Sequence, residues 1–123
     1  MTLHRLTDLD QLDAAFARSA AAPVLIFKHS PTCGISAQAH EEVASLAAET
    51  GLRAEVCLVI VQEDRRVSNE IARRLNHRHA SPQVLLVQGG VLQWHASHFR
   101  VTGQAIRAAL GRTQPPRPDL FHP

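Results

Sequence analysis

The chain has 123 residues, of which 45% are hydrophobic and 20% are charged, and its formal net charge is +2. This length predicts one globular domain that folds without a disulfide, and the small net charge argues against a nucleic-acid or membrane-surface partner. No apolar run approaches the roughly 20 residues of a membrane-spanning helix. The N-terminal segment lacks the apolar core of an export signal, so we expect a cytoplasmic protein whose two cysteines stay reduced.

Apolar residues recur in short runs and at helical spacing, and these patterns predict alternating strands and helices. In chain order we expect a strand at 2–6, a helix at 7–19, a strand at 22–30, a helix at 33–51, a strand at 52–62, a helix at 64–76, a hairpin at 82–88 and 91–97, and a helix at 103–111. Gly89 and Gly90 suit the two-residue turn of the hairpin. The order predicts an α/β fold: a central mixed sheet of four to five strands with helices on both faces.

The ends of the helices and of the domain carry their own signals. Thr7 and Thr102 are candidate N-caps, and Gly51 is a candidate C-cap. We assign residues 1–111 to the domain. Four of the seven prolines lie in residues 112–123, which we expect to form an extended C-terminal tail.

Cys33 stands where a helix follows the first long strand, and functional residues of open α/β sheets lie beyond the carboxyl ends of the strands. The unpartnered N–H groups of a helix start favour the thiolate, which is the form that attacks disulfides. Gly34 keeps its N–H and allows close approach, while Ser36 can donate a hydrogen bond to the sulfur. Lys28 and His29 can add positive charge before the turn. These residues predict a reactive cysteine rather than an inert loop residue.

The second cysteine is not expected to assist the first. Cys57 lies in the middle of a predicted strand, where a cysteine is usually a small buried hydrophobe. A disulfide needs Cα atoms within about 7 Å, which a strand interior and a strand end do not offer. Ser36 occupies the place of the second cysteine of a CxxC motif. Cys33 is therefore predicted to act as a single thiol.

The pair Ser81–Pro82 opens a predicted strand, a position where proline leaves the hydrogen-bond ladder intact. A cis bond here would turn the backbone sharply and present it to an incoming thiol substrate like an added strand. An ordinary trans proline is the more common alternative, and the residues alone leave both open.

Four segments together resemble a known family: FKHSPTCGIS, EDRRVSNEIARRL, HASPQVLLVQGG and WHASHF. They are similar to the YtxJ family, the monothiol bacilliredoxins, over roughly residues 7–110. The resemblance implies a thioredoxin-like fold and a cytoplasmic thiol-disulfide oxidoreductase. It also implies no bound cofactor, with the small thiol bacillithiol as a co-substrate.

By resemblance, Cys33 matches the active-site cysteine and Pro82 the cis-proline, while Gly34 replaces the proline expected after the cysteine. Around the thiol we expect a supporting set and a set that contacts substrate: Thr32, Gly34, Ser36, Ser81 and Pro82 for support, and Lys28, His29, His95 and His98 for contact.

The expected reaction is thiol-disulfide exchange without an internal resolving cysteine. Cys33 would attack the bacillithiol sulfur of a mixed disulfide on a client protein, and the client thiol would leave. A second small thiol would then free Cys33. The expected partners are bacillithiolated client proteins and a low-molecular-weight thiol, with no nucleic acid and no membrane.

Two other functions stay open at this point. Residues 33–36, CGIS, differ by one residue from the CGFS signature of monothiol glutaredoxins, which hold an iron–sulfur cluster between two protomers with glutathione. The segment around Pro82 lacks the threonine-valine-proline run of that family, and brown protein would indicate a cluster carrier. The third function is a non-catalytic thioredoxin-like binding module with a slowly reacting Cys33. The histidine spacings match no zinc motif, so we expect no metal site.

Overall fold

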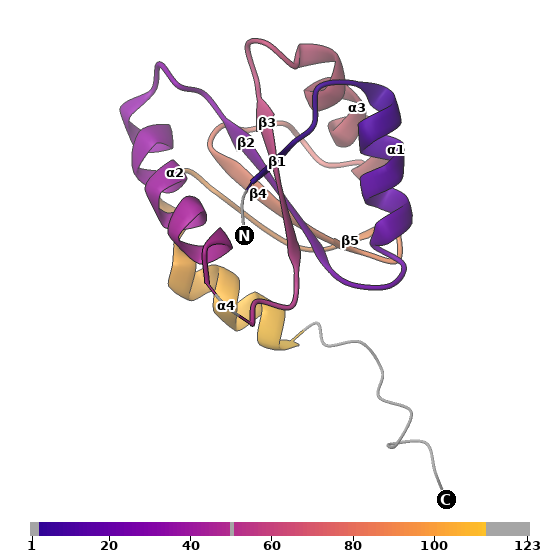
Figure 1. Ribbon diagram of the computed structural model, residues 1–123. Coiled ribbons are helices and arrows are strands. Elements are labelled where there is room, and N and C mark those ends of the chain that lie inside the picture. The colour runs from indigo at the N-terminus through magenta and orange to yellow at the C-terminus, as the bar shows by residue number, and fades with distance from the viewer. Residues whose placement is uncertain (1–2, 50, 113–123) are drawn as a thin grey trace, which may run out of the picture.

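The computed structural model describes residues 3–49 and 51–112. Its centre is a five-stranded sheet with the strand order β1-β3-β2-β4-β5 (Figure 1). In chain order the elements are β1 (His4–Arg5), α1 (Leu9–Arg18), β2 (Val24–His29), α2 (Gly34–Ala47), β3 (Glu55–Ile60), α3 (Arg65–Leu75), β4 (Gln83–Gln88), β5 (Val91–Ser97), the short 3-10 helix η1 (His98–Arg100) and α4 (Gly103–Arg112). Apart from η1, this order confirms the sequence-based prediction.

The sheet is mixed. Strands β1, β3 and β2 run parallel, whereas β4 is antiparallel to both β2 and β5. Gly89 and Gly90 take φ values of 63° and 74° in the turn of the β4–β5 hairpin, as their lack of a side chain permits. The same turn is fixed from a distance, because both glycine N–H groups donate to Ser19, one to its carbonyl at 2.7 Å and one to its hydroxyl at 2.9 Å.

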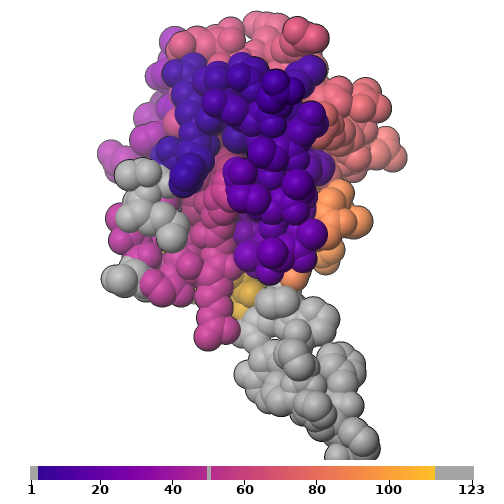
Figure 2. Space-filling view, turned by 45° about the vertical axis from the view of Figure 1, so that its right-hand side comes forward, coloured from indigo at the N-terminus to yellow at the C-terminus, as the bar shows by residue number. Residues whose placement is uncertain are grey.

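Helices cover both faces of the sheet, α1 and α3 on one and α2 and α4 on the other (Figure 1). Strand β2 lies at the centre and all of its residues are buried. Its side chains alternate between two hydrophobic clusters: Leu25 and Phe27 pack with α2 and α4, and Val24 and Ile26 pack with α1 and α3. Because Lys28 follows Val24 and Ile26 at the same two-residue spacing, its side chain also points toward α1 and α3. The outer surface of the α1 and α3 layer faces the reader in Figure 2.

The helix ends differ in detail from the prediction. Asp8, not Thr7, caps α1, because its carboxylate accepts from the N–H of Gln11 at 2.8 Å. Helix α2 ends at Ala47, so Gly51, with φ 83°, lies beyond its C-cap. The hydroxyl of Thr102 accepts from the N–H of Ala105, which confirms that cap. None of the described helices is long and apolar enough to cross a membrane.

The boundary predicted for the tail falls close to the end of the described chain. Helix α4 includes Arg112, one residue past the boundary drawn from the sequence. The remainder of the predicted tail, residues 113–123, lies outside the described residues.

Candidate active site

Cys33 directly precedes α2 and is partly exposed. Its extended backbone, with φ −109° and ψ 126°, follows a turn in which its N–H donates to the carbonyl of Ser30 at 3.0 Å. The Cys33 side chain makes no capping hydrogen bond, and the first turn of α2 holds no acidic residue. The positive end of the helix is therefore not neutralised by a carboxylate in its first turn.

Ser36 is buried, and its hydroxyl forms hydrogen bonds with residues before the Cys33 turn and not with the sulfur. It accepts from the N–H of Ser30 at 2.9 Å and lies 2.8 Å from Nδ1 of His29. The predicted hydrogen bond from Ser36 to Cys33 is wrong, because these two contacts orient the hydroxyl toward β2. Ser36 instead holds the chain on either side of the active-site turn in a fixed position.

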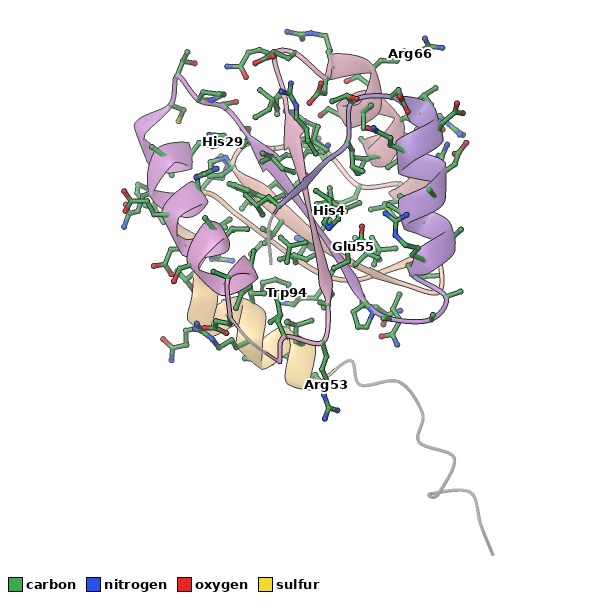
Figure 3. The ribbon with its side chains drawn as sticks, viewed as in Figure 1. His4, His29, Arg53, Glu55, Arg66 and Trp94 are labelled. Carbon is green, nitrogen blue, oxygen red and sulfur yellow. The ribbon has the colours of Figure 1, made fainter. Side chains whose placement is uncertain are left out.

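His29 lies between the end of β2 and α2 (Figure 3), with only 8% of its surface exposed. Its ring packs against the rings of His40, at 4.7 Å between centroids, and Phe27, at 5.5 Å. Burial lowers the pKa of His29, and the neighbouring charge of His40 lowers it further, against an opposing hydrogen bond at Ser36. His29 is thus a packing group of the interior, which leaves little surface for the predicted contact with substrate.

Lys28 is completely buried. Its Nζ donates to the carbonyl of Ser68 at 3.1 Å and lies 3.2 Å from Nδ1 of His79. Burial lowers the pKa of Lys28 to about 8. The predicted contact between Lys28 and an incoming thiol is wrong, because α3 and the loop before β4 cover the amine. A signal for this was present in the sequence, since a lysine inside a strand buried on both faces has no route to solvent.

The Ser81–Pro82 peptide bond is cis, which decides between the two alternatives left open by the sequence. The Ser81 hydroxyl lies 2.8 Å from the hydroxyl of Ser30, and the carbonyl of Pro82 accepts from the N–H of His98 at 2.9 Å. The loop before β4 is thereby joined to the Cys33 turn on one side and to η1 on the other. Three segments that are far apart in the sequence therefore meet where β2 ends and β4 begins.

Two hollows flank the cysteine turn. One, of about 220 Å³, lies at Pro31 and Thr32 on the side of β3, where the Thr32 hydroxyl accepts from Gln62 at 3.2 Å. The other, of about 160 Å³, lies between α2 and η1 and includes Ile35 and Phe99. Phe99 is 74% exposed. The sequence alone predicts no role for Gln62, Ile35 or Phe99. An exposed aromatic residue such as Phe99 has the same local sequence pattern as a buried one.

His95 and His98 are separated in space despite their close spacing. His95 is exposed on β5, and its ring packs on that of His77 at 4.0 Å. His98 lines the hollow beside Ile35 and has a left-handed φ of 57°. Contact of either histidine with substrate stays a prediction. Within residues 3–49 and 51–112, no three histidine, cysteine or acidic side chains are grouped so that they could hold a metal ion.

Cys57 is buried within β3, as predicted, and neither cysteine forms a disulfide. Its thiol donates to the carboxylate of Glu55 at 3.1 Å. Burial, followed by the neighbouring Glu55, strongly raises the pKa of the Cys57 thiol. Cys57 therefore stays protonated and unreactive.

The sequence pattern of the monothiol bacilliredoxin family matches residues 4–106. The chain belongs to this family. Among solved structures, this bacilliredoxin is similar to a candidate oxidoreductase with a thioredoxin fold, with 28% identity, a TM-score of 0.78, and coverage of 88% of this chain and 93% of the other.

Thioredoxins share the architecture of the bacilliredoxin at lower identity. The thioredoxin of Fasciola hepatica is 15% identical, with a TM-score of 0.74 and coverage of 91% and 100%. That of Malassezia sympodialis is 14% identical, with a TM-score of 0.73 and coverage of 90% of both chains. These structures show that the bacilliredoxin has the thioredoxin-like fold expected from its sequence. Family and fold together make it a thiol oxidoreductase.

Proposed function

We propose that this bacilliredoxin removes bacillithiol from mixed disulfides on client proteins through Cys33. The observation that carries the proposal is the contrast between the two thiols. Cys33 is partly exposed at the positive end of α2, whereas Cys57 is buried in β3 and held protonated. A chain with one accessible thiol exchanges disulfides only with the help of an external thiol.

The first step transfers the small thiol to the protein. The Cys33 thiolate attacks the bacillithiol sulfur of the mixed disulfide, a new S–S bond forms, and the client sulfur leaves as a thiolate that takes up a proton from water. The client cysteine is reduced, and Cys33 is oxidised to a mixed disulfide with bacillithiol. Attack on the small-thiol sulfur is favoured because it is the more accessible of the two.

The second step frees the protein. A bacillithiol thiolate attacks the bacillithiol sulfur bound to Cys33, bacillithiol disulfide forms, and Cys33 leaves as a thiolate. Over both steps the client sulfur gains one electron and the sulfur of the incoming bacillithiol loses one, while the transferred bacillithiol stays at the disulfide level. Cys57 has no place in this sequence of steps, because its thiol is protonated and inside the sheet.

Mass spectrometry of the intact protein tests the proposal. After incubation with bacillithiol disulfide, the wild type and Cys57→Ser are expected to gain one bacillithiol, and Cys33→Ser none. A client carrying bacillithiol should be released by the first two proteins only. Glutathione disulfide at the same concentration is the comparison for the identity of the small thiol. Equal release by Cys33→Ser would overturn the assignment of the thiol, and a preference for glutathione would overturn bacillithiol as co-substrate.

A further inference from the structure

We propose that Lys28 is a positioning residue for thiol exchange, in which its buried amine ties the loop of residues 76–82 to helix α3 and so fixes Ser81 beside the Cys33 turn. The inference rests on the exchange reaction proposed above. Lys28 is the single lysine of the chain, and its amine reaches the backbone of α3 at Ser68.

The first support is the pair of contacts made by the amine. Nζ bridges two segments, since Ser68 belongs to α3 and His79 belongs to the loop. A lysine ammonium has only donors, so Nδ1 of His79 is the acceptor and the imidazole proton lies on Nε2. The Ser68 hydroxyl lies 3.3 Å from the same Nδ1. The loop is thereby attached to α3 through a single imidazole nitrogen.

The second support is Gln83, which lies directly opposite Lys28 on β4. Opposed residues of an antiparallel pair project from the same face, so both side chains extend toward the loop. Gln83 is 2% exposed, and its amide nitrogen donates to the carbonyl of Arg78 at 3.1 Å. Its Oε1 is buried and accepts from no described group. Two adjacent buried polar residues thus hold one exposed loop.

The third support is the charge around the amine. No ion pair to Lys28 occurs among the described residues. Val59 on β3 and Gln83 on β4 are its uncharged neighbours across the sheet. Besides burial, the positive charge of Lys28 lowers the pKa values of two histidines of the loop, His77 and His79. The charge of Arg65 on α3 lowers the pKa of His79 further. A buried cation without a carboxylate is unfavourable for folding, so stability alone does not explain this lysine.

The position of the loop affects the surroundings of the Cys33 sulfur through two contacts. The backbone enters β4 at Gln83, four residues after His79. Between these two residues, the hydroxyl of Ser81 contacts that of Ser30. Ser30 in turn accepts the N–H of Cys33. A displaced loop would leave the thiol in place but misalign the surface against which a client disulfide binds. Misplacement of about 1 Å is enough to slow a reaction by up to roughly a hundredfold.

The test compares Lys28→Met and His79→Ala with two matched variants. His79→Asn retains an acceptor close to the position of Nδ1, and His4→Ala removes an exposed imidazole that makes no contact with the loop. Three quantities are measured: the kcat/KM for a bacillithiolated client, the alkylation rate of Cys33 by iodoacetamide, and the rate of tryptic cleavage after Arg78. The urea midpoint is recorded for each variant.

For Lys28→Met and His79→Ala, tryptic cleavage after Arg78 should rise severalfold, and kcat/KM should fall by about tenfold or more. Alkylation should stay within about twofold of wild type, because the start of α2 is untouched, and the urea midpoint of Lys28→Met should be unchanged or higher. His79→Asn should recover most of the wild-type behaviour, and His4→Ala should match wild type throughout.

Unchanged cleavage after Arg78 in both variants would overturn the inference. So would a parallel loss of alkylation and exchange, or a lowered urea midpoint in Lys28→Met with cleavage spread over the whole chain. If the wild type itself transfers no bacillithiol, the proposed function fails, and the cleavage rates alone then decide whether Lys28 holds the loop.

Discussion

The hydroxyl of Ser30 lies 2.8 Å from the hydroxyl of Ser81, and this contact joins the turn that leads into Cys33 to the loop that leads into β4. The two residues are 51 positions apart in the sequence, yet the contact brings their segments together beside the Cys33 turn. The contact therefore sets the spacing between the nucleophile and the strand beside which a substrate is expected to bind.

Ser81→Ala tests this contact. Loss of one hydroxyl pair should lower the free energy of unfolding by about 1 kcal/mol, and it should slow exchange with a client severalfold through the altered spacing. Ser45→Ala is the control, because Ser45 is an exposed residue of the same helix that follows Cys33. Stopped-flow kinetics and urea titration check both. Equal effects of the two substitutions would show that the Ser30–Ser81 contact has no role in the reaction.

Gly34 permits a matched pair of substitutions. A Cβ at this position would meet no heavy atom within 4 Å, and the extended conformation of Cys33 is the one required before proline. Both Gly34→Ala and Gly34→Pro should fold and should stabilise the protein by about 0.4–1 kcal/mol through the unfolded chain.

The two substitutions should differ in chemistry. Alanine keeps the backbone N–H at the start of α2, whereas proline removes it. Alkylation of Cys33 at pH 7 should therefore be unchanged in Gly34→Ala and severalfold slower in Gly34→Pro. Identical rates in the two proteins would show that this N–H does not stabilise the thiolate.

Acid should destabilise the protein through three imidazoles whose pKa values are lowered in the folded state. Burial lowers the pKa values of His29, His77 and His79 below the ordinary value of 6.5. Below about pH 6.5 the unfolded chain binds protons that the folded chain does not, so stability is fully present above this pH and falls as the pH drops. His29→Gln should flatten part of the decline between pH 7 and pH 5, measured by urea midpoints. An equally steep decline would exclude His29 as a contributor.

Lys28 should make the stability of the folded protein depend on pH in the alkaline range. Its pKa is lowered from 10.5 to about 8 by burial. Between these values the unfolded chain keeps a proton that the folded chain has lost, so the stability of the wild type should rise with pH relative to Lys28→Met. The relative gain from pH 8 to pH 10.5 should be about 2–3 kcal/mol, at about 1.4 kcal/mol for each pKa unit. A constant difference between the two proteins across this range would mean that Lys28 titrates as it does in the unfolded chain.

Local patterns in the sequence predict the elements of this fold well. The continuous apolar run of β2, the helical spacing of α3 and the paired glycines of the hairpin each specify one type of structure, and the structure has all three. The place of Cys33 before a helix follows from the same local order. Each of these features depends on residues close together in the chain.

The side-chain partners around the site depend instead on distant segments. The Ser36 hydroxyl is drawn to His29 and Ser30 because β2 ends beside the first turn of α2, which spacing along the chain does not reveal. The partners of Lys28 lie 40 and 51 residues away. Residue type suggested a surface charge at Lys28, whereas its position in the central strand dictated burial.

Ser19 gives the hairpin turn a partner about seventy residues upstream, at the end of α1. During synthesis on the ribosome, the first helix and the central strand emerge well before residues 89 and 90. Until then the Ser19 carbonyl lacks its glycine partner, and the Ser19 hydroxyl has only its local hydrogen bond to the carbonyl of Phe16. The amino-terminal half thus reaches its final packing only when the last two strands arrive, so a chain truncated before the hairpin leaves this corner of the molecule open to solvent.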